Sequence, residues 1–173
     1  MSAQSLGAGQ SRHARHVALT GLRLGGLAGL IAMAMLYLLR APLSQLFSND
    51  AAVIAMAAPL VGLVCFFHFF DSAQTQLTLV LRAWHITASP MLVHLTALWG
   101  IGLGGGWWLT YGRPAQGLAG GDASPGAAGF WVAGTVSLAV ATVALAVLLA
   151  RTWRRDPQTE GAAVDTAPMK RSR

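Results

Sequence analysis

The stretch VIAMAAPLVGLVCFFHFFDSAQTQLTLVLR, residues 53–82, places one acidic residue, Asp71, inside a long apolar run. On a helix that advances about 100° per residue, Asp71 shares an arc of about 120° with other polar or charged side chains. The rest of the circumference is mainly hydrocarbon, so this stretch predicts a membrane-spanning helix with one polar face. The side chains that share the arc with Asp71 are His68, Ser72, Thr75, Thr78 and Arg82.

Asp71 is the candidate functional residue of this helix. An ionised carboxylate near the centre of a bilayer costs on the order of 3 kcal/mol, so an acid at that depth predicts a functional site. Burial favours the neutral form of an acid, which makes Asp71 a candidate for proton exchange. Nearby, Gln74 and Gln76 add amides that could bond across helices or line water. The alternative is that Asp71 only makes a structural hydrogen bond to a neighbouring helix.

The composition is that of an integral membrane protein. Of 173 residues, 54% are hydrophobic and 10% are charged, against roughly a quarter charged in soluble domains. Backbone groups cannot stay unpaired in lipid, so we expect an all-α fold with four transmembrane helices. The predicted spans are about 17–39, 52–81, 91–111 and 127–150. They form a transmembrane region over 17–151, between an arm (1–16) and a disordered cytoplasmic tail (152–173).

The basic residues predict the orientation of these spans. The arm, the connection around Arg82 and the tail together carry nine of the twelve Lys and Arg residues, whereas the other two connections carry only Arg40 and Arg113. By the positive-inside rule, we expect both termini and the Arg82 connection to lie in the cytoplasm. We also expect a multi-pass protein of the inner membrane. The basic residues flank the apolar runs, so the lipid bilayer is the expected partner and nucleic acid is not.

Catalytic and cofactor chemistry finds little support in the sequence. Cys65 is the single cysteine, so no internal disulfide or cysteine-based metal site is available. No motif for a nucleophile, a phosphate loop or a metal cluster is present, and we expect neither an enzyme nor a cofactor. His68 and His94 lie on different predicted spans and could in principle ligate haem, but their depths do not match.

Small and capping residues predict how the helices begin and pack. Gly21, Gly25 and Gly29 recur every four residues on one face of the first span, where another helix could approach closely. Glycines at 100, 102 and 104–106 weaken regular helix in the third span and permit tight packing or a local break. Asp50 precedes the second span and is expected to cap it. The first span is too long for a signal peptide core, so we expect it to be retained.

Several stretches, taken in order, resemble one transporter family. These are QSLGAGQSRHARH (4–16), LFSNDAAV (46–53), FFDSAQTQLTLVLRAW (69–84), LWGIGLGGGWWL (98–109) and GFWVAG (129–134). Together they resemble the end of the multidrug and toxic compound extrusion (MATE) transporters, in the NorM-like branch. The resemblance covers roughly residues 1–152 and matches the last four of that family's twelve helices.

This resemblance implies a fold and an activity. MATE transporters have two six-helix lobes and export cationic amphipathic compounds in exchange for protons or sodium. By the resemblance, Asp71 corresponds to the acid that lines the cavity of the carboxy-terminal lobe and couples export to a cation. Gln74 corresponds to a neighbouring cavity residue. The expected cavity or substrate-lining set is His68, Ser72, Gln74, Thr75 and Thr78.

The sequence also departs from the family pattern. Ala83 follows Arg82 where a glycine is usual, and Gly104 replaces the proline of a Gly-Leu-Pro motif. The other eight helices, including a second acid, have no counterpart here. We therefore expect a piece of a longer transporter, or a remnant that assembles with itself or with a missing amino-terminal lobe. The alternative is a non-transporting membrane scaffold whose helices pack through glycine faces.

Overall fold

The computed structural model describes residues 11–111 and 126–155, and every regular element in these residues is a helix. The first part of the predicted arm, the third connection and most of the predicted tail lie outside the described residues. The helices are α2 (Ser11–Leu38), α3 (Arg40–Phe47), α4 (Ala51–Ala83), α5 (Ala88–Thr96), a π-helix η1 (Ala97–Gly104), α6 (Gly105–Tyr111) and α8 (Gly126–Arg154).

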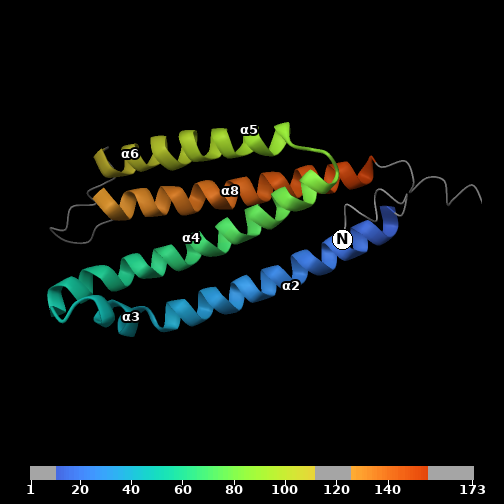
Figure 1. Ribbon diagram of the computed structural model, residues 1–173. Coiled ribbons are helices and arrows are strands. Elements are labelled where there is room, and N and C mark those ends of the chain that lie inside the picture. The colour runs from blue at the N-terminus through green and yellow to red at the C-terminus, as the bar shows by residue number, and fades with distance from the viewer. Residues whose placement is uncertain (1–10, 112–125, 156–173) are drawn as a thin grey trace, which may run out of the picture.

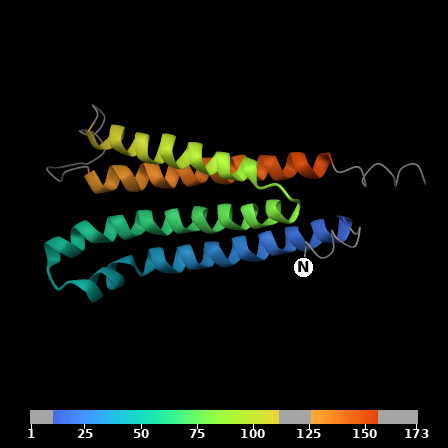
Figure 2. The same cartoon turned by 45° about the horizontal axis from the view of Figure 1, so that its top comes forward.

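The long helices lie side by side (Figures 1 and 2). Helix α2 packs on α4, α4 packs on α8, and α8 also packs on the continuous α5–η1–α6 segment. The start of α2, the end of α8 and the α4–α5 connection all lie at one end of the bundle, with short helix α3 at the other. This placement agrees with the predicted up-and-down path of four antiparallel segments.

Three helices, α2, α4 and α8, are long and apolar enough to cross a membrane. These helices confirm an all-α fold of the membrane-spanning class. Helix α4 has 33 residues and is about 50 Å long at 1.5 Å per residue, which exceeds a hydrocarbon core of about 30 Å.

The third predicted span is helical throughout but not uniform, because its middle forms the π-helix η1. Glycines occupy every second position from Gly100 to Gly104, and the lack of Cβ atoms lets the backbone widen there. Gly102 packs so closely on α8 that a Cβ there would lie 3.1 Å from Ser137 Oγ. The glycines thus account for a local change of helix type and for close packing on α8.

The core of the bundle lies between α4 and α8. It contains Leu77 and Leu81 of α4 and Leu145 and Leu149 of α8, each spaced by one helical turn. Helix α8 is thus a core element. The face of α8 that carries Leu145 and Leu149 is buried. The opposite face exposes Val136, Val140, Val143 and Val147.

Both ends of α4 have specific caps. At the start, the Ala52 N–H donates to Asp50 Oδ1 at 2.8 Å, which confirms the predicted cap. At the end, His85 has a φ of 58°. The Ile86 N–H donates to the Leu81 carbonyl at 3.1 Å, and the His85 N–H to the Arg82 carbonyl at 3.0 Å. This is a Schellman motif with histidine in the position that glycine usually takes.

Candidate functional site

Asp71 belongs to a row of polar side chains that joins α4 to α5. Gln74 Nε2 donates to Asp71 Oδ1 at 3.0 Å, one turn along α4. Gln74 Oε1 accepts from the ring nitrogen Nε2 of His94, on α5. The other ring nitrogen of His94 donates to the Pro90 carbonyl at 2.6 Å. Asp71 and His94 are half-buried and Gln74 is buried, so this row is a partly dry polar connection between two helices.

Local sequence explains why these three side chains meet. Asp71 and Gln74 are three residues apart and therefore neighbours on one face of α4. Pro90 lies in the first turn of α5, and its carbonyl, one turn before His94, fixes the imidazole ring. Helix α8 supports α4 at the same level, because Thr142 Oγ1 donates to the Phe70 carbonyl at 3.3 Å.

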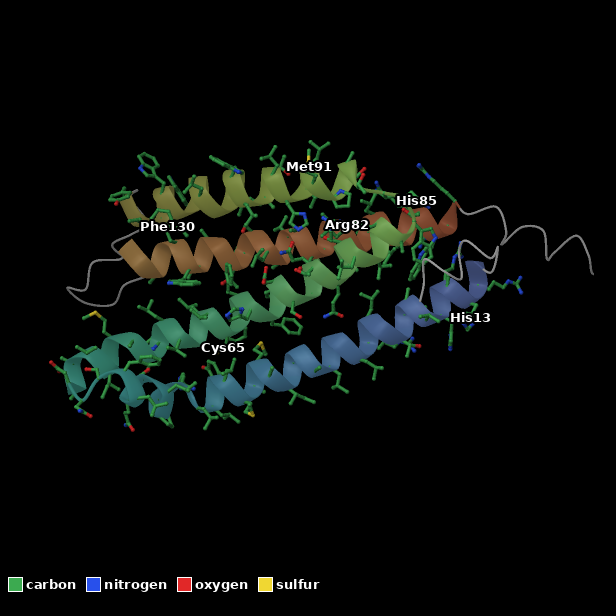
Figure 3. All side chains as sticks on the ribbon, viewed as in Figure 1. His13, Cys65, Arg82, His85, Met91 and Phe130 are labelled. Carbon is green, nitrogen blue, oxygen red and sulfur yellow. The ribbon has the colours of Figure 1, made fainter. Side chains whose placement is uncertain are left out.

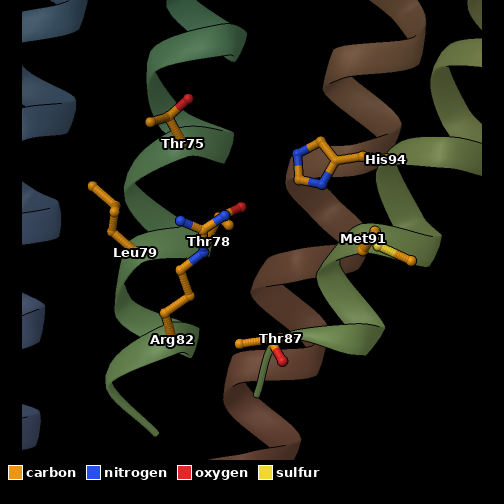
Figure 4. Close-up of a pocket in the computed structure, with 7 residues that line it drawn as sticks. All are labelled: Thr75, Thr78, Leu79, Arg82, Thr87, Met91 and His94. Atoms are coloured by element: carbon orange, nitrogen blue, oxygen red, sulfur yellow. The ribbon is translucent and has the colours of Figure 1, made fainter. Parts of the chain in front are cut away.

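A cleft of about 570 Å³ opens beside this row, between α4 and α5 (Figure 4). The imidazole of His94 and the side chains of Thr75 and Thr78 face each other across it. On α4, Asp71 is one turn from Thr75 and within about 40° of Thr75, Thr78 and Arg82 around the helix. Asp71 therefore continues the polar stripe of the cleft toward the middle of α4. The lining residues are Thr75, Thr78, Leu79, Arg82, Thr87, Met91 and His94.

The remaining predicted residues lie on a different side of α4. His68 and Ser72 line a smaller cavity of about 290 Å³ between α2 and α4, together with Cys65 and Gly29. Figure 3 shows Cys65 between these two helices. The polar arc expected from the sequence is thus divided between two cavities. Because His68 and His94 line separate cavities, they do not form the ligand pair that a bis-histidine haem needs.

The α2–α4 contact is built on glycine. A Cβ at Gly25 would overlap the side chain of Gln76, and one at Gly29 would lie 3.7 Å from the Phe69 ring. Gln76 also donates to Ser72 Oγ at 3.3 Å along α4. Gly21 has no neighbour within 4 Å of its Cβ position, so two of the three predicted glycines form the contact.

Sequence reasoning missed the part of the site that α5 contributes. His94 appeared only as a possible haem ligand, and Thr87 and Met91 were not singled out. The signal that could have found His94 is its spacing from Pro90. The ring of a histidine in a helix can reach the carbonyl four residues before it, and a bond from Nδ1 to that carbonyl leaves Nε2 to face a neighbouring helix.

Comparisons with known proteins identify the family of this chain. The family model MatE matches residues 1–108. A probable multidrug resistance protein NorM of Aromatoleum aromaticum is 39% identical over 150 residues, which are 86% of this chain and 31% of that protein. The multidrug resistance protein PmpM of Pseudomonas aeruginosa is 35% identical over 152 residues, 87% of this chain and 30% of that protein.

A NorM protein of Chromobacterium violaceum is 38% identical over 155 residues, again 86% of this chain and 31% of the relative. The chain thus spans about a third of the length of the curated relatives that it matches. Long apolar helices and this family match together make it a multi-pass membrane protein. The resemblance seen in the sequence is confirmed, and the chain belongs to the MatE family.

Proposed function

We propose that this chain forms the Asp71-containing part of a cation-coupled multidrug efflux antiporter. In this proposal, Asp71 binds a proton or a sodium ion and releases it as a cationic amphipathic compound binds. The protein lies in the inner membrane, with the α4–α5 connection and both termini in the cytoplasm. The multidrug resistance names of the NorM and PmpM relatives support this class of function.

The observation that carries the proposal is the position of Asp71. Among the described residues, Asp71 and Asp50 are the only acids, and Asp50 is used as the cap at the start of α4. Asp71 instead lies in the middle of a span and accepts from a buried amide. An acid at that depth carries a free-energy cost, and a role in exchanging one cation for another would explain why it is present.

The cleft supports an organic substrate. Its volume of about 570 Å³ lies within the 300–1,000 Å³ that is typical of small-molecule sites. Leu79 and Met91 provide apolar surface, and the hydroxyls of Thr75, Thr78 and Thr87 provide polar contacts. This mixture suits an amphipathic compound whose positive charge points toward Asp71.

Other helices would complete the site. Alternating access needs two bundles that move around a shared site, and the described helices form one bundle. Large apolar side chains are exposed along α2, including Leu24, Leu27, Ile31 and Met35. We propose that lipid covers part of this surface and that the remaining helices of the transporter, in the same chain or in a second one, cover the rest.

The test is efflux of a cationic dye from a bacterial strain that lacks its own multidrug exporters. The chain is expressed alone and also in place of the matching third of the Aromatoleum NorM relative. We expect Asp71→Asn to reduce dye efflux at least tenfold at unchanged membrane levels in whichever form is active. The reason is that an amide cannot exchange a proton and binds sodium poorly.

Asp50→Asn is the matched control, because it also removes one carboxylate from α4 but leaves the amide able to cap the helix. Its efflux should stay within about twofold of the wild type. Equal efflux by the Asp71→Asn variant and the wild type would contradict the proposal. A form that is active only when joined to the relative's helices would show that the other bundle is required.

A further inference from the structure

The row Asp71–Gln74–His94 connects the acid to the cleft through a single amide. We propose that His94 is a second proton-binding group of the site, and that Gln74 couples its protonation to that of Asp71. The inference rests on the proposed role of Asp71 as the exchanging acid and adds the partner residue through which Asp71 responds to the cleft.

Donors and acceptors determine the proton positions in the row. A carboxylate oxygen only accepts, and it is the Nε2 amide group of Gln74 that donates to Asp71. The remaining amide oxygen of Gln74 and the Pro90 carbonyl also only accept, and each contacts a different ring nitrogen of His94. With the amide in this orientation, both ring nitrogens carry a hydrogen. This first arrangement of the row thus pairs an Asp71 carboxylate with a positively charged His94.

A half-turn of the Gln74 amide gives a second complete arrangement. The amide oxygen and nitrogen exchange places at almost no steric cost because they are similar in size. A protonated Asp71 then donates its O–H to Gln74 Oε1, and Gln74 Nε2 donates to the bare Nε2 of a neutral His94. The bond from His94 Nδ1 to Pro90 is kept. Asp71 has gained one proton and His94 has lost one, so the number of protons in the row is unchanged.

The mixed protonation states are less favourable. Suppose that Asp71 is ionised, His94 is neutral and the Gln74 amide keeps its orientation. One ring nitrogen of His94 then lacks a hydrogen but still faces an oxygen, either of Gln74 or of Pro90. The hydrogen bond between that nitrogen and that oxygen is lost. If both residues are protonated, the row carries an uncompensated positive charge in a partly dry site. Uptake of a proton by Asp71 therefore favours release of a proton by His94, and the reverse.

The surroundings place His94 on the accessible side of this pair. Its ring lines the cleft. Asp71 is not among the lining residues and lies one turn before Thr75, toward the middle of α4. His94 can thus exchange protons with water in the cleft, and Gln74 transmits the change to Asp71. Arg82 is the other ionisable residue that lines the cleft. Ionisable side chains on the surrounding helices are Cys65 and His68 on α4, Arg12, His13, Arg15, His16 and Arg23 on α2, and Arg151 and Arg154 on α8.

The experiment is a pH titration of the histidine rings of the purified 173-residue chain in lipid nanodiscs. The rings carry ¹⁵N, so NMR reports how many protons each ring holds, and His94→Asn identifies the His94 signals. The pH at which His94 takes up its second proton should differ between the wild type and Asp71→Asn, because the compensating carboxylate is gone in the variant.

Asp50→Asn is the control and should leave the titration of His94 unchanged. Unaltered ring signals of His68 and His85 would show that each variant has kept its fold. Identical His94 titrations in the wild type and in Asp71→Asn would overturn the coupling.

Gln74→Leu tests whether the amide carries the coupling. In this background, Asp71→Asn should no longer shift the His94 titration, since the connecting donor and acceptor are absent. A shift as large as in the wild-type background would show that the two charges interact without Gln74 and would overturn its role. The NMR experiment requires no transport. If Asp71→Asn leaves efflux unchanged, the proposed function fails while the titration still decides whether the two residues are coupled.

Discussion

The two sides of α4 differ in how they hold polar side chains. Toward α5, Asp71 and Gln74 form hydrogen bonds that end on another helix, beside a cleft of about 570 Å³. Toward α2, Gln76 and Ser72 bond to each other within α4 and pack against glycines. The first side links two helices through groups that can change protonation, whereas the second side only lets two helices approach closely. Polar residues on one helix therefore need not form one site.

The largest expected effect is a difference in stability between variants of the two glutamines of α4, Gln74 and Gln76. Gln74→Leu removes the donor to Asp71 and the acceptor of His94, and leaves two partly buried groups unpaired. We expect the free energy of unfolding to fall by about 2–3 kcal/mol. The measurement is chemical unfolding of the chain in detergent micelles, followed by circular dichroism.

Gln76→Leu is the matched control for that change. It loses only a bond within α4, and leucine can fill the same space against Gly25. Its free energy of unfolding should change by less than about 1 kcal/mol. If Gln74→Leu and Gln76→Leu lowered the free energy of unfolding equally, the hydrogen bonds from Gln74 to Asp71 and His94 would add no more stability than the bond within α4.

A second substitution sharpens the description of the α2 side as a packing surface. In Gly25→Leu the new side chain must displace Gln76 and push α2 away, which should cost about 2 kcal/mol. The same substitution at Gly21 meets open space and should change stability by less than about 0.5 kcal/mol. Both variants should retain the coupling between Asp71 and His94. Loss of that coupling in Gly25→Leu would show that the two sides are not independent.

A smaller effect is expected at the end of α4, which positions α5 and hence His94. His85 has a left-handed backbone conformation that glycine adopts without strain. His85→Gly should therefore raise the free energy of unfolding by about 1 kcal/mol, and His85→Val should lower it by at least as much. The same micelle unfolding assay measures both. A His85→Gly variant less stable than the wild type would contradict the Schellman geometry or point to a use of the imidazole.

Much of the fold follows from composition and hydropathy. Three predicted spans, 17–39, 52–81 and 127–150, overlap with α2, α4 and α8, because lipid imposes both length and helicity. Helix ends extend beyond the apolar runs, as in α2, which begins at Ser11, because hydropathy does not detect a helix that continues past the hydrocarbon. The π-helix could not be predicted, because glycines permit several backbone geometries and packing against α8 selects one.

The candidate site was predictable only in part. Asp71 stands out because it is an acid in an apolar helix, and Gln74 because it is a nearby amide that the family resemblance places in the cavity. The partner on α5 depends on the depth and rotation of one helix relative to another, which one sequence does not contain. For the same reason, the arc that includes His68, Ser72 and Thr75 was treated as one surface, although packing against α2 divides it.

The most direct test of the account is competition at Asp71 between an inorganic cation and an organic one. Binding of the cation tetraphenylphosphonium to the active form of the protein is measured by equilibrium dialysis while pH and sodium concentration are varied. We predict that acidification or added sodium weakens binding to the wild type and to Asp50→Asn, and that this dependence disappears in Asp71→Asn. Binding to the wild type that is independent of both pH and sodium, or a dependence that persists in Asp71→Asn, would contradict the account.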